Sequence, residues 1–135
     1  MSSWPYEALV AAIERGSLRD CARISAEIRR DPWGVVARQV EEYLGYEQPA
    51  GVGALLRRAV DRARREAEDR ERAAVAARVA ELVASSGLSM ADFAARTGTS
   101  RSRLSTYRSG RVTPSAALMV RMEQLAARAA VEGRG

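Results

Sequence analysis

The hydrophobic residues of the first 50 positions recur every three to four residues, the spacing of an α-helix with one buried face. Three short helices are predicted, at residues 5–14, 17–30 and 31–44, with Ser17 capping the second. Asp31-Pro32 is a typical start for the third, because a capping carboxylate precedes proline at the first helical position. The positions predicted to form the core of this bundle are Leu9, Val10, Ile13, Leu18, Cys21, either Ile24 or Ser25, Ile28, Val36, Val40, Tyr43 and Leu44, together with Trp4 and Trp33.

Residues 52–86 contain no proline and only one glycine, near the start, so the whole stretch is predicted to be one long helix. Its middle, residues 61–72, has ten charged residues out of twelve, five of each sign. Many of these charges are spaced four apart, as in Glu66–Arg70 and Glu68–Arg72, which is typical of a solvent-exposed helix with ion pairs along it. A thin apolar stripe follows the same helix, and it is compatible either with contact to the N-terminal bundle or with a dimer seam. The stripe consists of Leu56, Val60, Ala63 and Ala67.

After Gly87 the pattern changes to short helices with polar starts. Helices are predicted at residues 89–97 and 99–108, separated by Gly98, and a last helix is predicted from Thr113-Pro114 onward. Two short helices joined through one glycine, with a longer helix before and another after, form the layout of a helix-turn-helix. The residues predicted to face inward are Val75, Val79, Leu82, Val83, Phe93, Ala94, Leu104, Tyr107, Leu118, Met122 and Leu125.

Charge is distributed unevenly along the 135 residues, which carry a net charge of +5. All 22 basic residues are arginine, so their distribution is more informative than their number. Residues 1–50 have 6 arginines and 8 acids, whereas residues 87–135 have 8 arginines and 3 acids. Between positions 87 and 111 there are five arginines and a single acid, Asp92. A one-sided excess of this kind indicates a phosphate-backbone partner.

The run GLSMADFAARTGTSRSRLSTYRSGRVTPS, residues 87–115, resembles the Cro-like class of phage repressors, often called the XRE family of helix-turn-helix domains. The resemblance extends over residues 73–130. Together with the helical pattern, it implies an all-α chain with four parts: a small helical bundle at 1–50, a charged connecting helix at 51–72, the DNA-binding domain, and a tail at 131–135. The residues that carry the resemblance are Gly87, Leu88, Ser89, Phe93, Ala94, Gly98, Leu104, Ser109, Gly110, Arg111, Thr113, Pro114 and Ser115.

In such a domain the second short helix lies in the major groove and presents its N-terminal side chains to base edges. Because Leu104 and Tyr107 must point inward, the opposite face is expected to contact bases, with Arg101 suited to a bidentate contact with guanine. The expected base-contacting residues are Arg101, Ser102, Ser105 and Thr106. The expected phosphate-contacting residues are Ser89, Met90, Ser100, Arg103, Arg108, Ser109 and Arg111.

The chain departs from the class at two positions. Met90 stands where Gln is common, and Thr97 replaces a usual aliphatic residue, which predicts looser packing there.

These features predict a sequence-specific transcriptional regulator that binds double-stranded DNA as a homodimer on a roughly palindromic operator, with repression as the default mechanism. An alternative is an antitoxin-like factor whose residues 1–50 bind a second protein while the C-terminal domain regulates its own operon. A third interpretation is DNA binding without sequence preference.

Other functional classes find little support in the sequence. The chain has no His and a single Cys, Cys21, so the usual general base, most zinc sites and an activated thiolate are unavailable. Neither an enzyme, a cofactor nor a metal site is therefore predicted, and the Cys21 thiol is expected to be packed. Without a secretion signal or a membrane-spanning run, a bacterial cytoplasmic protein is expected, associated with the nucleoid when bound to DNA.

Overall fold

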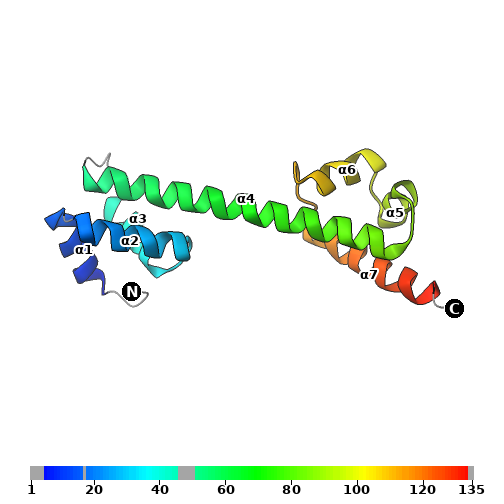
Figure 1. Ribbon diagram of the computed structural model, residues 1–135, viewed down its shortest axis with the longest axis horizontal. Coiled ribbons are helices and arrows are strands. Elements are labelled where there is room, and N and C mark those ends of the chain that lie inside the picture. The colour runs from blue at the N-terminus through cyan, green and yellow to red at the C-terminus, as the bar shows by residue number, and fades with distance from the viewer. Residues whose placement is uncertain (1–4, 17, 46–50, 134–135) are drawn as a thin grey trace. The chain divides into compact units, whose positions relative to one another are not determined.

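The computed structural model describes residues 5–16, 18–45 and 51–133, and within these ranges the chain is all-helical, as predicted (Figure 1). The long helix has the predicted bounds, and the short helices lie within a few residues of theirs. The helices are α1 (Tyr6–Arg15), α2 (Leu18–Arg30), α3 (Val35–Leu44), α4 (Val52–Ser86), α5 (Met90–Thr97), α6 (Arg101–Ser109) and α7 (Ala116–Glu132).

The chain divides into two compact units, Met1–Glu68 and Asp69–Gly135, and α4 contributes its first half to one and its second half to the other. Each unit has a hydrophobic core of its own. We call them unit 1 and unit 2 and describe each by itself.

Unit 1 is built from α1, α2 and α3, which lie along the first half of α4 (Figure 1). The apolar stripe of α4 is used here, because Leu56, Val60 and Ala63 are buried in the same cluster as the three short helices. This assigns these three residues of the stripe to contact with the bundle; the fourth, Ala67, is buried but does not belong to the cluster. The Cys21 thiol is free, partly buried and packed against the same cluster. The buried members of the cluster are Leu9, Ala12, Ile13, Ile24, Ile28, Val36, Ala37, Val40, Leu44, Leu56, Val60 and Ala63.

Two predicted core residues of unit 1 are exposed instead. Trp33 is 45% exposed, and its ring lies under the guanidinium of Arg64, with 5.6 Å between the ring centroid and Cζ. Leu18, the first residue of α2, is 81% exposed. The predicted core residue Trp4 and the predicted cap Ser17 lie outside the described residues.

Trp33 is exposed because the third helix begins later than predicted. Asp31-Pro32 does not start a helix; it belongs to a turn in which the amide of Gly34 donates to the carbonyl of Asp31 over 3.0 Å. Gly34 is extended, and α3 begins at the next residue, Val35. The indole is thereby placed on a turn rather than on the buried face of a helix.

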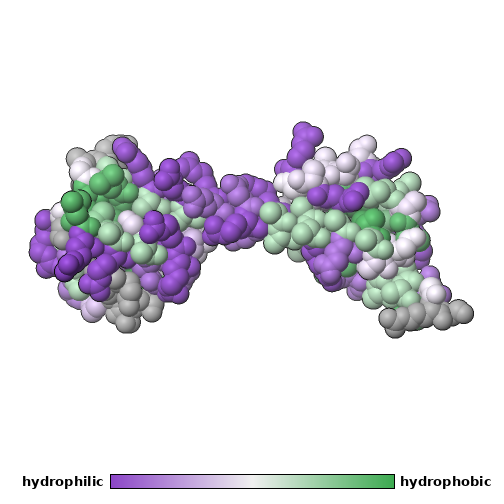
Figure 2. Space-filling view, viewed as in Figure 1, coloured by the Kyte–Doolittle hydropathy of each residue, from purple (hydrophilic) through white to green (hydrophobic). Residues whose placement is uncertain are grey.

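The charged stretch 61–72 is largely exposed, as predicted, and it appears purple in the space-filling view (Figure 2). Its ion pairs differ from the predicted ones. Arg72 pairs with Asp69, three residues before it, rather than with Glu68. Arg64 instead reaches α3, where it forms an ion pair of 2.7 Å with Glu41.

Unit 2 places α5 and α6 on one side of the end of α4 and α7 on another, with α5 in contact with both α6 and α7 (Figure 1). Every residue predicted to face inward here is buried, except Val75, which is partly buried against the cluster. At the surface, Arg78 of α4 donates two hydrogen bonds to Glu123 of α7, of 2.9 and 2.7 Å. The buried cluster comprises Val79, Leu82, Val83, Phe93, Ala94, Leu104, Tyr107, Leu118, Met122, Leu125 and Ala126.

Among the described residues, no single helix combines the length and hydropathy needed to cross a membrane. Taken together, α4 and α5 pass the same test by length and composition alone, although they are bent by 105° at their junction.

Candidate nucleic-acid interface

Each helix that follows α4 begins with a serine whose hydroxyl caps it. The Ser89 side chain accepts from the amide of Asp92 at the start of α5, and Ser100 accepts from Arg103 at the start of α6, both over 3.1 Å. Ser115 caps α7 in the same way, so the last helix starts at Ala116 and not at the predicted Thr113-Pro114. Serine at this position satisfies amides that have no partner within the helix. The caps therefore fix where each short helix begins.

The turn between α5 and α6 is set by Gly98, which adopts a left-handed conformation with φ of 85°. The amides of Gly98 and Thr99 donate back to the carbonyls of Ala95 and Ala94, over 3.2 and 2.9 Å. These two bonds close α5 as a Schellman motif, which strongly favours glycine because a side chain is strained at that φ. The chain can therefore reverse within three residues and start α6 at Arg101.

Thr97 ends α5 and is only 1% exposed. Its hydroxyl donates to the carbonyls of Phe93 and Ala94, over 2.9 and 3.1 Å. A buried hydroxyl costs free energy unless it is hydrogen-bonded, and here that requirement is met within the helix. The polar residue at this position is accommodated in the core for that reason.

The two sides of α6 differ sharply. Leu104 is fully buried and Tyr107 is 9% exposed, so they anchor the helix to unit 2. Residues advance by about 100° around a helix, which places Ser102 and Ser105 across from this buried side. The surface over α6 is correspondingly hydrophilic to neutral in colour (Figure 2).

The four residues expected to contact bases lie on the part of α6 that is not buried. Arg101, Ser102 and Ser105 are exposed, and Thr106 is half-buried. The Thr106 hydroxyl donates to the carbonyl of Arg103 over 2.6 Å, which leaves its oxygen lone pairs as acceptors. The exposed face therefore offers one guanidinium at the first turn and short hydroxyls along its length.

The residues expected to contact phosphates are spread over the ends of α5 and α6. Ser89 and Ser100 are the helix caps, so their hydroxyls already accept a backbone amide. Ser109 is engaged at the other end of α6, where its hydroxyl donates to the carbonyl of Thr106 over 3.0 Å. Arg103 and Arg111 are exposed, and Arg111 follows the left-handed Gly110 that ends the helix.

Two of these residues, distant in sequence, are brought together. Arg108 donates from Nη1 to the sulfur of Met90 over 3.3 Å, which links the end of α6 to the start of α5. A thioether is a weak acceptor and carries no charge. The contact therefore joins the two helix ends without placing an opposite charge beside the Arg108 guanidinium.

A further cation, Arg96, is exposed in the last turn of α5, close to the turn in sequence. Arg96 lies outside α6 and is not among the predicted contact residues, although it belongs to the excess of arginine over residues 87–111. No group of three or more His, Cys, Asp or Glu side chains that could hold a metal ion occurs in the described part of the chain. The surface of α5 and α6 therefore provides positive charge and hydrogen-bonding groups.

Comparison with known proteins identifies the same segment. Residues 79–126 match a family model described as Helix-turn-helix. The matched segment begins in the second half of α4, includes all of α5 and α6, and ends within α7. No curated protein and no solved structure matches the chain. The predicted helix-turn-helix is thereby confirmed.

Proposed function

We propose that this DNA-binding regulator of transcription, with its Cro/XRE-type helix-turn-helix domain at residues 79–126, is a sequence-specific repressor that inserts α6 into the major groove. The observation that carries the proposal is the exposed side of α6. It presents Arg101, Ser102 and Ser105, while Leu104 and Tyr107 hold the helix in place from the opposite side. Arginine and hydroxyl side chains are the groups that read base edges there.

The surrounding charge supports the same role. Unit 2 carries 11 arginines against 6 acids, whereas unit 1 carries 11 of each. Arg103, Arg108 and Arg111 would position the domain through phosphates, as would the capped amide ends of α5 and α6. In this proposal the arginines of α6 are paired with the negatively charged phosphates of DNA.

The proposal includes a homodimer. One helix-turn-helix domain covers about half of an operator, and affinity and specificity normally come from two domains on a roughly palindromic site. The simplest mechanism is repression by occupying a promoter, in the bacterial cytoplasm and on the nucleoid. A measured mass of two chains in solution, and a selected site with two-fold symmetry, are the expected results.

The experiment that tests the proposal is selection of bound sequences from a random duplex pool by the purified full chain. Arg101→Ala is expected to reduce the discrimination between bases at one operator position by about 1–3 kcal/mol of binding free energy, because a bidentate contact from arginine to a base provides that much discrimination. Competition between the selected duplex and its single-base variants measures the change.

Arg108→Ala serves as the matched comparison, because it removes the same charge from the other end of α6. Loss of the Arg108 side chain is expected to weaken binding to all sequences equally. It is also expected to reduce the slope of log K against log salt concentration by about one, the value for one phosphate contact. Equal affinity of the wild-type chain for every duplex would contradict specific recognition and leave binding without sequence preference. No duplex binding at low salt would contradict the proposal as a whole.

Unit 1 is proposed to bind a second protein. This unit has a complete core of its own, and its equal numbers of arginines and acids give it no net attraction for DNA. Such a role is that of an antitoxin-like factor whose helix-turn-helix domain regulates its own operon. Co-purification of one defined polypeptide with the full chain, lost when unit 1 is altered, is the expected result.

A further inference from the structure

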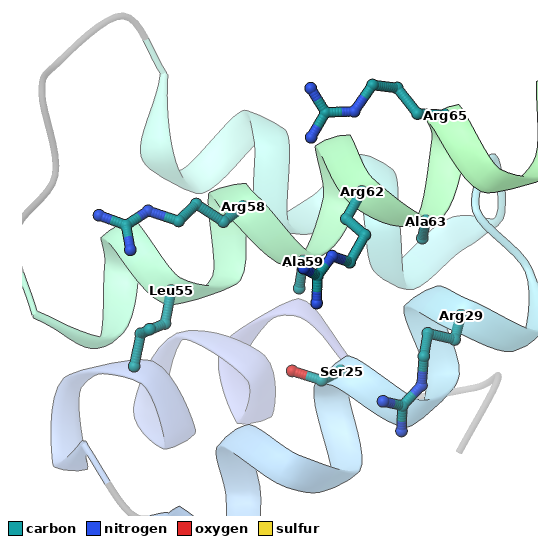
Figure 3. Close-up of a pocket in the computed structure, with 8 residues that line it drawn as sticks. All are labelled: Ser25, Arg29, Leu55, Arg58, Ala59, Arg62, Ala63 and Arg65. Atoms are coloured by element: carbon teal, nitrogen blue, oxygen red, sulfur yellow. The ribbon is translucent and has the colours of Figure 1, made fainter.

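An open groove of about 460 Å³ lies between α2 and α4 within unit 1 (Figure 3). We propose that this groove binds an acidic, partly apolar helical segment of a partner protein. The inference rests on the proposed partner-binding role of unit 1 and is independent of DNA binding by unit 2. The residues that line the groove are Ser25 and Arg29 of α2, with Leu55, Arg58, Ala59, Arg62, Ala63 and Arg65 of α4.

The charge of the groove is entirely positive. Four of its eight lining residues are arginines and none is acidic. No described carboxylate lies within 4 Å of the guanidiniums of Arg29, Arg58, Arg62 or Arg65. An anionic ligand would therefore meet four cations that the fold itself does not neutralise.

Neighbouring arginines that do not line the groove are bonded to other groups of unit 1, unlike the four that line it. Arg64 is held by Glu41 and by the carbonyl of Pro32, and Arg57 donates to the carbonyl of Gly45 over 2.8 Å. On α2, Arg30 donates to Glu27, while the adjacent Arg29 faces the groove. On α4, the arginines that bond to α3 and its flanking residues are therefore different from those that line the groove.

The arrangement of the guanidiniums indicates an extended ligand. Arg58, Arg62 and Arg65 are spaced four and three residues apart, which is about 10 Å along one side of α4. Figure 3 shows that their guanidiniums are spread apart and do not converge on one point, as they would around a single small anion. Carboxylates repeated along a helix match this spacing.

The apolar part of the groove distinguishes a polypeptide from a nucleic acid. Leu55 is 50% exposed, Ala59 is half-buried, and Ala63 lines the groove as a buried residue of the unit 1 core. An amphipathic helix laid in a groove places apolar side chains on such a floor and charged ones at its edges. A sugar-phosphate backbone would gain nothing from Leu55, and unit 1 as a whole is uncharged by residue count.

The test uses the full chain and a fluorescein-labelled helical peptide of about 18 residues, roughly 27 Å long, with leucine on one face and glutamate on its flanks. Anisotropy is expected to show saturable binding of this probe. Arg58→Gln with Arg62→Gln is expected to weaken binding at least about tenfold. The matched control, Arg19→Gln with Arg38→Gln, removes two exposed arginines that do not line the groove and should change affinity less than about twofold.

Three further measurements make the test decisive. A peptide with glutamine in place of glutamate should not bind, and a lysine peptide should bind Arg58→Glu with Arg62→Glu in preference to the wild-type chain. Duplex binding by all variants should stay unchanged, so failure of this inference is distinguishable from failure of the repressor proposal. Thermal melts of the variants test whether the fold is retained, and an unchanged Tm is expected because the substituted side chains are exposed.

The inference is overturned if the glutamate peptide does not bind, or if it binds the groove variant and the wild-type chain equally. Loss of duplex binding in the groove variant would assign these arginines to DNA phosphates and overturn it as well. A change of oligomeric mass in the groove variant, without peptide binding, would assign the groove to a second copy of the chain.

Discussion

Single serines determine where the helices of unit 2 begin. The hydroxyls of Ser89, Ser100 and Ser115 each accept the amide three residues further on. The start of the first helix was predicted at residue 89, in agreement with the cap at Ser89. Ser115 was not predicted, because Thr113-Pro114 is an equally good local start signal and the choice between two adjacent starts depends on how α7 packs.

Removing the cap of α6 is expected to destabilise unit 2. Ser100→Ala should lower the free energy of unfolding by about 1 kcal/mol, because the amide of Arg103 loses its acceptor. Ser102→Ala is the control, since that side chain is exposed and caps nothing, and its effect should stay within about 0.5 kcal/mol. Urea denaturation followed by circular dichroism measures both, and equal effects would contradict a capping role.

At the scale of elements, an ion pair at the surface links α7 to α4. Arg78 donates to both carboxylate oxygens of Glu123 and also forms an ion pair of 3.2 Å with Glu81. The hydrogen bond from Arg78 is the main cause that lowers the pKa of Glu123 below its ordinary value of 4.5. A carboxyl group with a lowered pKa in the folded state stabilises the fold above its ordinary pKa, and this contribution is lost as the pH falls through the lowered value.

Glu123→Gln is therefore expected to lower the Tm slightly at neutral pH, and this difference is expected to disappear as the pH falls through the lowered pKa of Glu123. The effect is small because both side chains are nearly half exposed. Melting curves at several pH values measure it. Glu132→Gln, an exposed residue at the end of the same helix, provides the control and should show no such pH-dependent difference.

Elements with local signals could be predicted from the sequence, and contacts between elements could not. Leu104, Tyr107 and Gly98 were placed correctly because helical spacing and a left-handed glycine are local properties. Trp33 was misplaced because its exposure depends on a turn and on Arg64, 31 residues away. The groove was not foreseen for the same reason: the spacing of arginines along α4 does not reveal which of them α3 uses.

At the scale of the whole molecule, two separate cores share one helix. Leu56 is buried in the core of unit 1 and Leu104 in that of unit 2. Leu56, Val60 and Ala63 of the apolar stripe are buried against α1–α3, so the proposed homodimer would not form through these residues. Since the apolar contacts of each unit are its own, the two units are expected to lose stability independently.

Leu56→Ala is expected to reduce hydrogen-exchange protection in α1–α3, and Leu104→Ala in α5–α7. Each substitution should cost about 2–5 kcal/mol in its own unit, because both side chains are fully buried. Exchange measured by mass spectrometry resolves the two regions in one sample. Equal loss of protection in both regions from either substitution would contradict independent units and indicate a single cooperative fold.

The exposed side of α6 carries only guanidinium as its source of positive charge, and the chain contains neither His nor Lys. A guanidinium keeps its proton throughout the range in which proteins remain folded. Acidification to about pH 6, or alkalinisation to about pH 9, would therefore leave the proposed attraction for phosphate intact. If α6 contacts DNA as proposed, control of binding has to come from the concentration of the protein or from another ligand, because the positive charge of this helix does not change over that pH range.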